Sequence, residues 1–436
     1  DMLINIDGKS VIIKNLQKYH NEDPVYKVKL ASIYDTTTFS KEHPIYSCTP
    51  KRRYNNYRKV KTGLPERYYD YDFQFNKVSE LKVGDYVKTP IPYRCEMDMN
   101  EYKETDIWYL IGVILGDGWI EKDYSIHIAF NAKETYLIDR CGYIVNKYFD
   151  RRFTKSKDKG TCYEYSFCNK KFALFFNENF GKYAGFKHIE EKVKKIPFAY
   201  RKNLILGYID TDGCVTRNSI NIVSISKRLL NDIQDWFFSL GIVSSIKKLR
   251  DEEIQIIRNA EVHTKKTYQL NVGTEGLNKI KDWEYTGMKL LNYEKVEITN
   301  HNRNDVFVKS GYIYLKVKQI EKEDYIGDVY NFECDTHTFM CNYIPTHNCD
   351  PYDDDQSNTM SLGSIFVLDL WKDELVAEYT GRPLYADDFF EICRRMCLFY
   401  NGRLNYEYNK KGLFAYFSSR NCVYLLTEVL DFLKDK

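Results

Sequence analysis

The tetrapeptide Thr346-His347-Asn348-Cys349 combines side chains that could cut the main chain. The Asn348 amide can attack its own carbonyl carbon, close a succinimide ring and release Cys349. The His347 imidazole could protonate the leaving amine, and the Cys349 thiol could carry an acyl group. Taken alone, so short a motif is more often a polar loop. Only the rest of the chain favours the catalytic interpretation.

Two acidic residues end the two copies of an internal repeat. Residues 110–118 (LIGVILGDG) resemble residues 205–213 (ILGYIDTDG), and each copy predicts an apolar helix that ends at Asp117 or Asp212. Small residues on one helical face, such as Gly112, favour close packing of one helix against another. We expect the glycine after each acid to adopt the left-handed cap that ends many helices.

A carboxylate at a helix C-terminus is disfavoured by the helix dipole, and two adjacent carboxylates repel each other. A divalent cation bound between Asp117 and Asp212 would relieve both penalties, and oxygen ligands favour Mg²⁺. A metal held by carboxylates can polarise phosphate and activate water, as a nuclease requires. The alternative is a pair of core helices whose acids only face solvent, and the repetition of the pattern favours the metal site.

The bulk composition indicates a large chain with several folded units. Its 436 residues have room for about three domains, and its formal net charge is only +2. The charge is uneven, because residues 349–436 carry 10 Lys and Arg against 15 Asp and Glu. The preceding part is therefore net basic and suits a polyanion.

The cysteines and the apolar runs favour a cytoplasmic protein. The 12 cysteines form no matched CxxC pairs, which argues against structural zinc and favours reduced thiols. The sequence shows no signal peptide and no apolar run of membrane-spanning length, so we expect no membrane partner.

Strand and helix patterns divide the chain into four segments. Residues 1–103 and 301–348 predict short β-strands with turns between them, whereas residues 104–300 mix helices and strands. An all-β unit interrupted by an α+β insertion accounts for this order, and the repeat predicts two pseudo-symmetric αββα modules in the insertion. Residues 349–436 begin with an acidic stretch and then predict two strands, a helix and a third strand.

The two repeat stretches resemble the LAGLIDADG motifs of homing endonucleases. The resemblance implies a monomer whose strands form a saddle in the major groove of double-stranded DNA, with Asp117 and Asp212 binding Mg²⁺ at the scissile phosphates. It also implies a catalytic lysine at Lys195 and a weaker counterpart at Lys227, and a solvated surface charge is the alternative for each. The first copy departs from the motif, because Leu115-Gly116 stands where Asp-Ala is usual.

The β-rich ends resemble the Hint domain of inteins, a horseshoe of β-strands. In this resemblance His43 polarises the N-terminal scissile peptide and His337 assists the cyclisation of Asn348, although Asn331 stands where Asp is usual. Inteins begin with Cys or Ser, whereas this chain as given begins with Asp1. We therefore expect no splicing by this polypeptide, and at most cleavage after Asn348.

Residues 349–436 would then belong to the host protein, the extein. They resemble the start of the nuclease domain of a tailed-phage large terminase subunit, which has an α/β ribonuclease H-like fold. The resemblance implies that Asp350 and Glu407, the latter at the end of a strand predicted for residues 403–407, are metal ligands. An ordinary α/β fragment with surface acids is the alternative.

Together these patterns predict an intein that carries a site-specific, Mg²⁺-dependent DNA endonuclease, working in the cytoplasm of a host cell of a phage or virus. Two alternatives stay open. One is a terminase-type packaging nuclease in which the insertion is incidental. The other is an endonuclease unit that has decayed to a DNA-binding module. The intact Asp117 and Asp212 argue against decay, and the altered first motif argues mildly for it.

Overall fold

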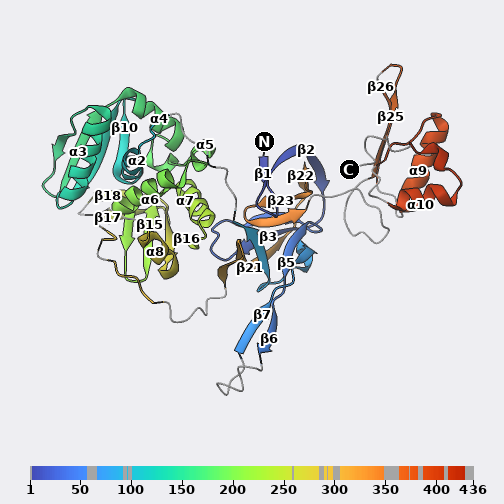
Figure 1. Ribbon diagram of the computed structural model, residues 1–436, viewed down its shortest axis with the longest axis horizontal. Helices are drawn as coiled ribbons and strands as arrows, with labels where there is room; N and C mark the ends of the chain where they lie inside the picture. The colour runs from blue at the N-terminus through green and yellow to red at the C-terminus, as the bar shows by residue number, and fades with distance from the viewer. Residues whose placement is uncertain are drawn as a thin grey trace.

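The structure is a computed structural model of the 436-residue chain (Figure 1). It describes residues 2–55, 66–91, 96, 101–257, 260–283, 289–291, 293–297, 305–347, 363–372, 374–381, 386–406 and 411–427. Within these ranges no helix is both long and apolar enough to cross a membrane.

Strands from both ends of the chain share one sheet, in a β-rich unit. The larger sheet has the strand order β23-β24-β5-β9-β21-β3-β4, with β20 beside β21 and β8 beside β5, and a second sheet has the order β1-β2-β22. A separate hairpin is formed by β6 and β7. The elements are β1 (Met2–Ile4), β2 (Ser10–Asn21), β3 (Val25–Leu30), β4 (Thr37–Ser40), β5 (Pro44–Cys48), β6 (Lys51–Asn55), β7 (Glu66–Asp70), β8 (Gln74–Lys77), η1 (Val78–Glu80), β9 (Tyr86–Pro90), β20 (Val306–Lys309), β21 (Tyr312–Glu323), β22 (Gly327–Cys334), β23 (Thr338–Cys341) and β24 (Ile344–His347).

Between these strands lies an inserted unit made of two modules with the same topology. The sheets have the orders β10-β11-β13-β12 and β14-β15-β19-β16. Module one contains α2 (Thr105–Asp117), β10 (Gly118–Glu121), β11 (Ser125–Asn131), α3 (Thr135–Phe149), β12 (Thr154–Asp158), β13 (Cys162–Cys168) and α4 (Lys170–Phe180). After η2 (Ala184–Phe186) and α5 (Glu191–Lys194), module two contains α6 (Phe198–Asp212), β14 (Gly213–Val215), β15 (Ser219–Ser224), α7 (Lys227–Ser239), β16 (Ser244–Arg250), β19 (Thr267–Gly273) and α8 (Thr274–Lys281).

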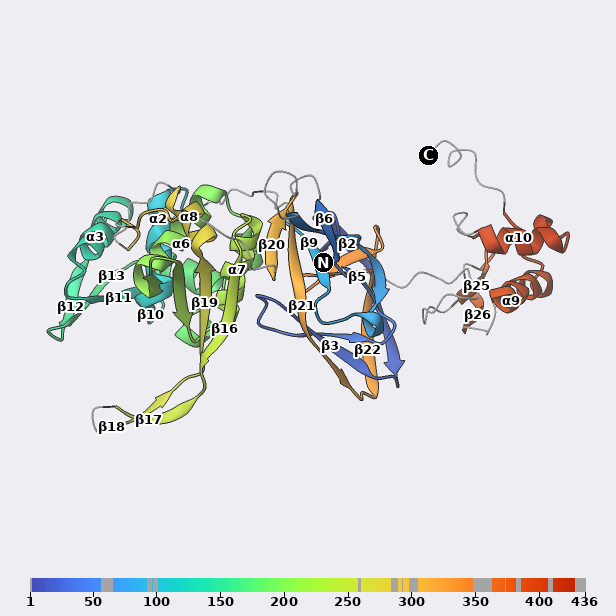
Figure 2. The same cartoon turned by 90° about the horizontal axis from the view of Figure 1, so that it is seen from below.

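The predicted order αββα is incomplete, because it lacks the last three elements of each module. Each module has a further pair of strands and a closing helix, so the order is αββαββα. In module two a hairpin of β17 (Glu253–Ile257) and β18 (Ala260–Thr264) is added between β16 and β19, and it projects from the unit in Figure 2. The similarity of the two copies was recognised only as far as the second helix, so the later strands and the closing helix were not predicted.

Alternating burial explains how each sheet packs. Ile126, Ile128 and Phe130 of β11 are buried, and the residues between them point to the opposite face. The helices cover one side of the two sheets and leave the strands on the other side (Figure 2). The inserted unit therefore has one helical face and one open sheet face.

The C-terminal unit is small. It contains β25 (Gly363–Asp369), β26 (Glu374–Gly381), α9 (Ala386–Phe399), α10 (Lys411–Ser419) and η3 (Val423–Leu425). The two strands form a hairpin, and α9 and α10 pack around Phe417. The strand predicted for residues 403–407 is wrong over its described part, because only Leu404 pairs, in an isolated parallel bridge with Leu426.

Candidate active site at the paired helix ends

Glycine allows α2 and α6 to pack backbone to backbone. A Cβ added at Gly112 would lie 2.0 Å from the Leu204 oxygen, and one added at Gly207 would lie 2.1 Å from the Tyr109 oxygen. Neither position can hold a side chain, since such distances are far below van der Waals contact. The close packing predicted from the small residues of the repeat is confirmed.

The expected left-handed cap is wrong in both copies. Gly118 has φ −110° and Gly213 has φ −80°, both extended conformations. The chain passes directly from each helix into a strand, and a Cβ at Gly213 would lie 2.5 Å from the oxygen of Ile209. Glycine is required here because the strand leaves the helix so closely, and not because of a positive φ.

The two helix ends bring Asp117 and Asp212 into each other's electrostatic field. Burial and the negative charge of Asp117 raise the pKa of Asp212 to about 7. Burial and Glu134 raise the pKa of Asp117. Lys187 and Lys289 act in the opposite direction on both acids. The pair therefore resists ionisation unless positive charge is added.

Lys187 was not found in the sequence analysis, yet it lies at the centre of this site. Its Nζ is buried and donates to the oxygens of Leu115 and Gly118 at 2.7 and 3.0 Å, at the C-terminal end of α2. Burial lowers the pKa of Lys187 to about 8, while Asp212 and Asp117 oppose this shift. The lysine thus places a cation where two carboxylates meet.

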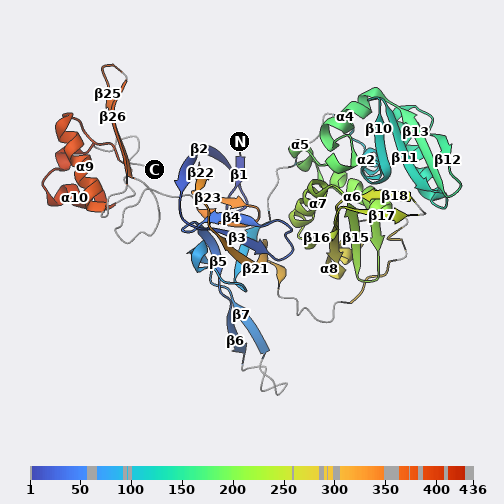
Figure 3. The ribbon, with the colours of Figure 1, turned by 180° about the vertical axis from the view of Figure 1, so that it is seen from behind.

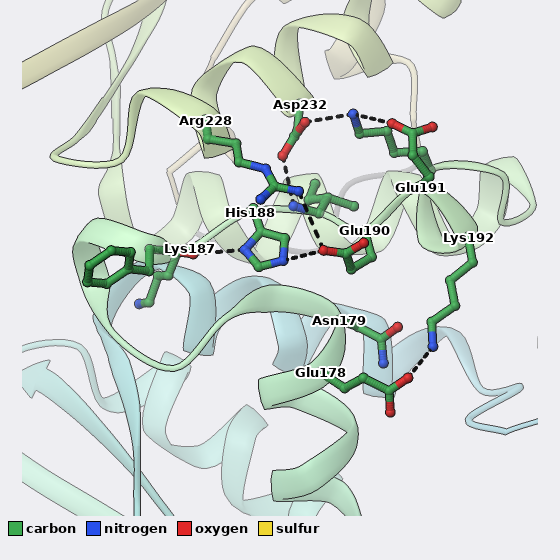
Figure 4. A network of polar contacts seen from close by, with 12 residues as sticks. Glu178, Asn179, Lys187, His188, Glu190, Glu191, Lys192, Arg228 and Asp232 are labelled. Carbon is green, nitrogen blue, oxygen red and sulfur yellow. Dashed lines mark hydrogen bonds and ion pairs between the residues drawn. The ribbon is translucent and has the colours of Figure 1, made fainter. Parts of the chain in front are cut away.

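A short loop fixes the position of Lys187. Ser226, the N-cap of α7, donates from its hydroxyl to the oxygen of Lys187 at 2.5 Å. The next residues are held by ion pairs, among them His188 with Glu190 at 2.7 Å. Figure 4 shows this network, with the ammonium group of Lys187 directed away from it.

Lys289 is the counterpart of Lys187 in module two. Its Nζ donates to the oxygen of Thr211 at 2.5 Å, at the C-terminal end of α6. Each lysine follows the closing helix of its own module, α4 or α8. Aligning whole modules, instead of the short motifs, would have found both residues.

The two lysines predicted from the sequence lie elsewhere. Lys195 precedes α6, whose 15 residues separate it from Asp212 by about 20 Å at a rise of about 1.5 Å per residue. Lys227, the first residue of α7, forms an ion pair with Asp35 of the β-rich unit at 2.7 Å. The structure does not bring Lys195 to the acids, because the motif that suggested it lies at the far end of the helix.

The residues at the site fit a hydrated divalent cation. In the described part of the chain, no group of three or more His, Cys, Asp or Glu side chains could hold a metal ion alone. Mg²⁺ commonly uses one or two carboxylates and takes its other ligands from water or phosphate. The buried Tyr208 hydroxyl interacts with the Asp212 carboxylate and adds a further polar oxygen beside it.

The open sheet face of module one carries a charged cluster, which we define as Glu121, His127, Lys157 and Glu164. His127 lies 3.0 Å from Glu164 and 3.4 Å from Glu121. Lys157 lies 3.1 Å from Glu164. The His127 ring also stacks on Trp119 with 5.3 Å between centroids.

The corresponding face of module two carries an amide ladder, which we define as Asn221, Gln269 and Asn271. Asn271 donates from Nδ2 to Oδ1 of Asn221 at 2.8 Å. Strand register makes the two faces comparable: Trp119 pairs with His127 as Cys214 pairs with Asn221. Glu164 pairs with Ala129, two residues after His127, and Gln269 pairs with Val223, two residues after Asn221. Glu164 therefore corresponds to Gln269.

Part of the second module is similar to a known family. Residues 199–270 match the family model of the LAGLIDADG-like domain. The match runs from α6 into β19, so it includes Asp212, and we call the inserted unit the LAGLIDADG-like unit from here on.

Two solved structures resemble the chain weakly. The structure of I-DmoI in complex with DNA and Ca has a TM-score of 0.31 and 18% identity, and the alignment covers 41% of this chain and 91% of that chain. Full-length DUF199/WhiA from Thermatoga maritima has a TM-score of 0.29 and 14% identity, with 43% and 58% covered.

Among the curated proteins, the relatives match over part of their length. The ATP-dependent DNA helicase Hel308 of Thermococcus kodakarensis is 30% identical over 237 residues, 51% of this chain and 20% of the helicase. The ribonucleoside-diphosphate reductase NrdEB subunit alpha of Bacillus subtilis is 22% identical over 312 residues, 64% of this chain and 28% of the subunit. The chain thus spans less than a third of each of these relatives.

A histidine cluster lies in the β-rich unit. Burial and the nearby charge of His347 lower the pKa of His43 to about 4, and the ring of His43 stacks on Phe39. The rings of His337 and His347 stack with 6.2 Å between centroids. The structure therefore brings together the three histidines that the sequence singled out.

The remaining predicted residues cannot be compared with the structure. Asn348, Cys349, Asp350 and Glu407 lie outside the described residues. Asn331, which stands where the Hint resemblance calls for Asp, is buried and accepts a hydrogen bond from the Phe332 amide at 3.0 Å.

Proposed function

We propose that the LAGLIDADG-like unit is a DNA endonuclease with its active site at Asp117 and Asp212. The observation that carries this proposal is the junction of two acids and two lysines at the ends of paired helices. Two buried acids whose pKa values are raised by burial and by neighbouring carboxylates are typical of a functional site and not of a structural core. A divalent cation, Mg²⁺ by our proposal, would be held by the two carboxylates and would polarise a phosphate and activate water.

The residues of the chain have separate roles in this proposal. Lys187 and Lys289 supply positive charge beside the acids, which favours a phosphate group there and the charge that develops as its ester bond breaks. The open sheet face, with the charged cluster and the amide ladder, contacts the bases of double-stranded DNA. Because one chain contains both modules, a monomer forms the whole site.

The test uses the purified chain and a randomised double-stranded DNA library in Mg²⁺. Asp117→Asn and Asp212→Asn should each lower cleavage by about 10²-fold or more, since each removes a carboxylate from the metal site. Asp123→Asn, an exposed acid of the same unit that pairs with Lys182, is the matched control and should keep full activity. Unaltered cleavage by both the Asp117→Asn and the Asp212→Asn variants would contradict the proposal.

The decayed-module alternative predicts a different result in the same assay. A unit that only binds DNA would retard a DNA fragment in a gel and would not nick it in Mg²⁺. Both acids are present and both lysines contact the helix ends that carry them, which favours an active enzyme.

We further propose that the LAGLIDADG-like unit lies within an intein whose β-rich unit is a Hint domain. Similar segments recur in proteins named as a helicase and as a reductase subunit, and most of each relative lies outside the match. A segment that recurs in unrelated hosts suits a mobile insertion. The cluster of His43, His337 and His347 at the end of β24 supports chemistry at the bond that follows.

In this proposal Asn348 cyclises and releases Cys349. His337 and His347 would transfer the protons. Mass spectrometry of the incubated chain should detect a fragment that begins at Cys349, and Asn348→Ala should abolish it. A single species of full mass after prolonged incubation would contradict self-cleavage.

We propose, finally, that residues 349–436 are part of a host nuclease of the terminase type, with Asp350 and Glu407 as metal ligands. The hairpin followed by a helix agrees with the order expected from that resemblance. If this unit were the source of DNA cleavage, activity would require Glu407 and survive Asp117→Asn. The reverse pattern assigns cleavage to the LAGLIDADG-like unit.

A further inference from the structure

The turn between β23 and β24 contains Tyr343, a bulky residue in the left-handed backbone conformation. Cys341 pairs with Ile344, so Asn342 and Tyr343 form a two-residue turn. Both have positive φ, 46° and 69°. Turns of this type favour glycine at the second position, because the left-handed region crowds a bulky side chain. Tyr343 must therefore be held in place by contacts that outweigh this preference.

Those contacts come from the LAGLIDADG-like unit. The Tyr343 hydroxyl donates to the carboxylate of Asp235 on α7. Its ring packs edge-on against Phe238 of the same helix, with 5.1 Å between centroids. On the β-rich side the Tyr343 oxygen accepts a hydrogen bond from the Thr89 hydroxyl.

Phe238 belongs to the core of the β-rich unit. It is 1% exposed and packs in a cluster with Leu30, Ile33 and Ile344. A side chain of α7 therefore belongs to the same buried cluster as Ile344, the first residue of β24. In Figures 1 and 3, α7 lies on the side of its unit that faces the β-rich unit.

Other contacts continue this interface along α7 and β16. Gln234 donates from Nε2 to the oxygen of Ser32 at 3.1 Å, and the Ile246 amide donates to the same oxygen at 3.3 Å. Within its own sheet, β24 pairs with β23 over four residue pairs and with β5 through one described pair, Thr346 with Ile45. The contacts with α7 are therefore made at the turn where β24 begins, in addition to the pairing within the sheet.

We propose that α7 of the LAGLIDADG-like unit positions β24 and, with it, His347 and the junction that follows. Tyr343, Asp235 and Phe238 are the positioning residues. The consequence for the junction rests on the proposed self-cleavage, whereas the support of β24 does not. The inserted unit is then a structural part of the self-cleaving unit, and not an independent passenger.

Hydrogen exchange on the full chain tests the support directly. Tyr343→Gly tolerates the turn conformation but loses both contacts with α7, so the amides of β24 should exchange at least about tenfold faster. Asp235→Asn, a milder change, should give a smaller increase in the same amides. Arg228→Ala is the control, because Arg228 lies on the same helix but pairs with Glu190 of its own unit. Unchanged exchange in β24 with Tyr343→Gly would overturn the proposal.

The rate of cleavage after Asn348 gives a second readout. Tyr343→Gly should slow it about tenfold, and Tyr343→Phe, which keeps the ring contact with Phe238, should have a smaller effect. If the wild-type chain does not cleave, the proposed self-cleavage fails, while the exchange experiment still decides whether α7 supports β24. Faster exchange with an unaltered cleavage rate would overturn the positioning of the junction.

Discussion

The two modules of the LAGLIDADG-like unit share one backbone plan but present different chemistry on their open sheet faces. Module one carries the charged cluster, in which His127 lies between two glutamates. Module two carries the amide ladder at corresponding positions, with Asn221 in place of His127 and Gln269 in place of Glu164. At the helix ends, in contrast, the modules match: each supplies one acid and one lysine.

This contrast separates the parts of the unit by their proposed tasks. A catalytic centre that cuts two strands needs equivalent groups on both sides, because the two phosphates are chemically identical. Base recognition needs no such symmetry, since each half of a DNA site can have its own sequence. We therefore expect substitutions at the helix ends to act alike in both modules, and substitutions on the sheet faces to act on one half-site each.

After the two acids, the largest effect is expected from the lysines. Lys187→Met and Lys289→Met should each lower DNA cleavage by about 10- to 100-fold, because each removes a cation beside the acids. Cleavage of a plasmid that carries a selected site would measure both rates. A large loss for one lysine and none for the other would break the symmetry of the centre.

The same pair should differ in stability. Lys187 is buried and donates to several carbonyl oxygens at the end of α2, so its loss should lower the free energy of unfolding by about 2–4 kcal/mol. Lys289 is only partly buried, and its loss should cost about 1 kcal/mol. Thermal unfolding of the two variants, compared with Lys202→Met on the surface of α6, checks this difference.

The lysines also show what the sequence could and could not predict. The repeat located Asp117 and Asp212 because a local pattern, an apolar helix followed by Asp-Gly, is readable in a single chain. Lys187 and Lys289 reach the acids from loops that follow the closing helices, and the contact depends on tertiary folding. Lys195 was predicted from the family resemblance because it lies just before a motif, and the length of α6 separates it from Asp212.

The same distinction between local and tertiary causes applies to the fold. The short strands predicted for residues 301–348 are confirmed, because β20 to β24 lie there. The left-handed caps were not correct, since the conformation of Gly118 and Gly213 is set by the strand that each helix enters. The contact of Tyr343 with α7 joins segments far apart in the chain, and no local pattern indicates it.

A smaller effect is expected on the sheet faces. Carboxylates accept hydrogen bonds from cytosine amino groups, whereas Asn and Gln pair with adenine. Gln269→Glu should therefore shift the preference of module two's half-site from adenine toward cytosine at one position, by about 1–3 kcal/mol. Glu164→Gln should act on the other half-site.

Selection from a randomised library, at fixed salt, measures both preferences. Asp139→Asn is the control for Glu164→Gln, because it removes the same charge from an exposed position on α3, on the helical side of module one. A shift in both half-sites with either variant would mean that the faces do not act separately. An identical consensus for the variants and the wild-type chain would show that these residues do not contact bases.

The smallest effect concerns pH. Since the pKa of Asp212 is about 7 in the folded chain and lies near 3.8 for an unperturbed side chain, the metal-free fold retains a proton there that the unfolded chain has lost. The contribution of this proton to folding stability is full below about pH 3.8. It declines as the pH rises from there and is lost above about pH 7. A divalent cation must displace the proton, so Mg²⁺ affinity should fall about tenfold per pH unit below 7.

Calorimetric titration of Mg²⁺ between pH 6 and 8 would measure this dependence, and comparison with Asp212→Asn isolates it. In folding stability His43 acts in the opposite sense, because its pKa of about 4 means that the unfolded chain binds the extra proton between pH 4 and 6.5. If Asp117 and Asp212 share one cation, Asp117→Asn should lower the pKa of Asp212, since the repulsion that helps to raise it is gone. A pH dependence of Mg²⁺ affinity that Asp117→Asn leaves unaltered would mean that the two acids do not act on the same ion.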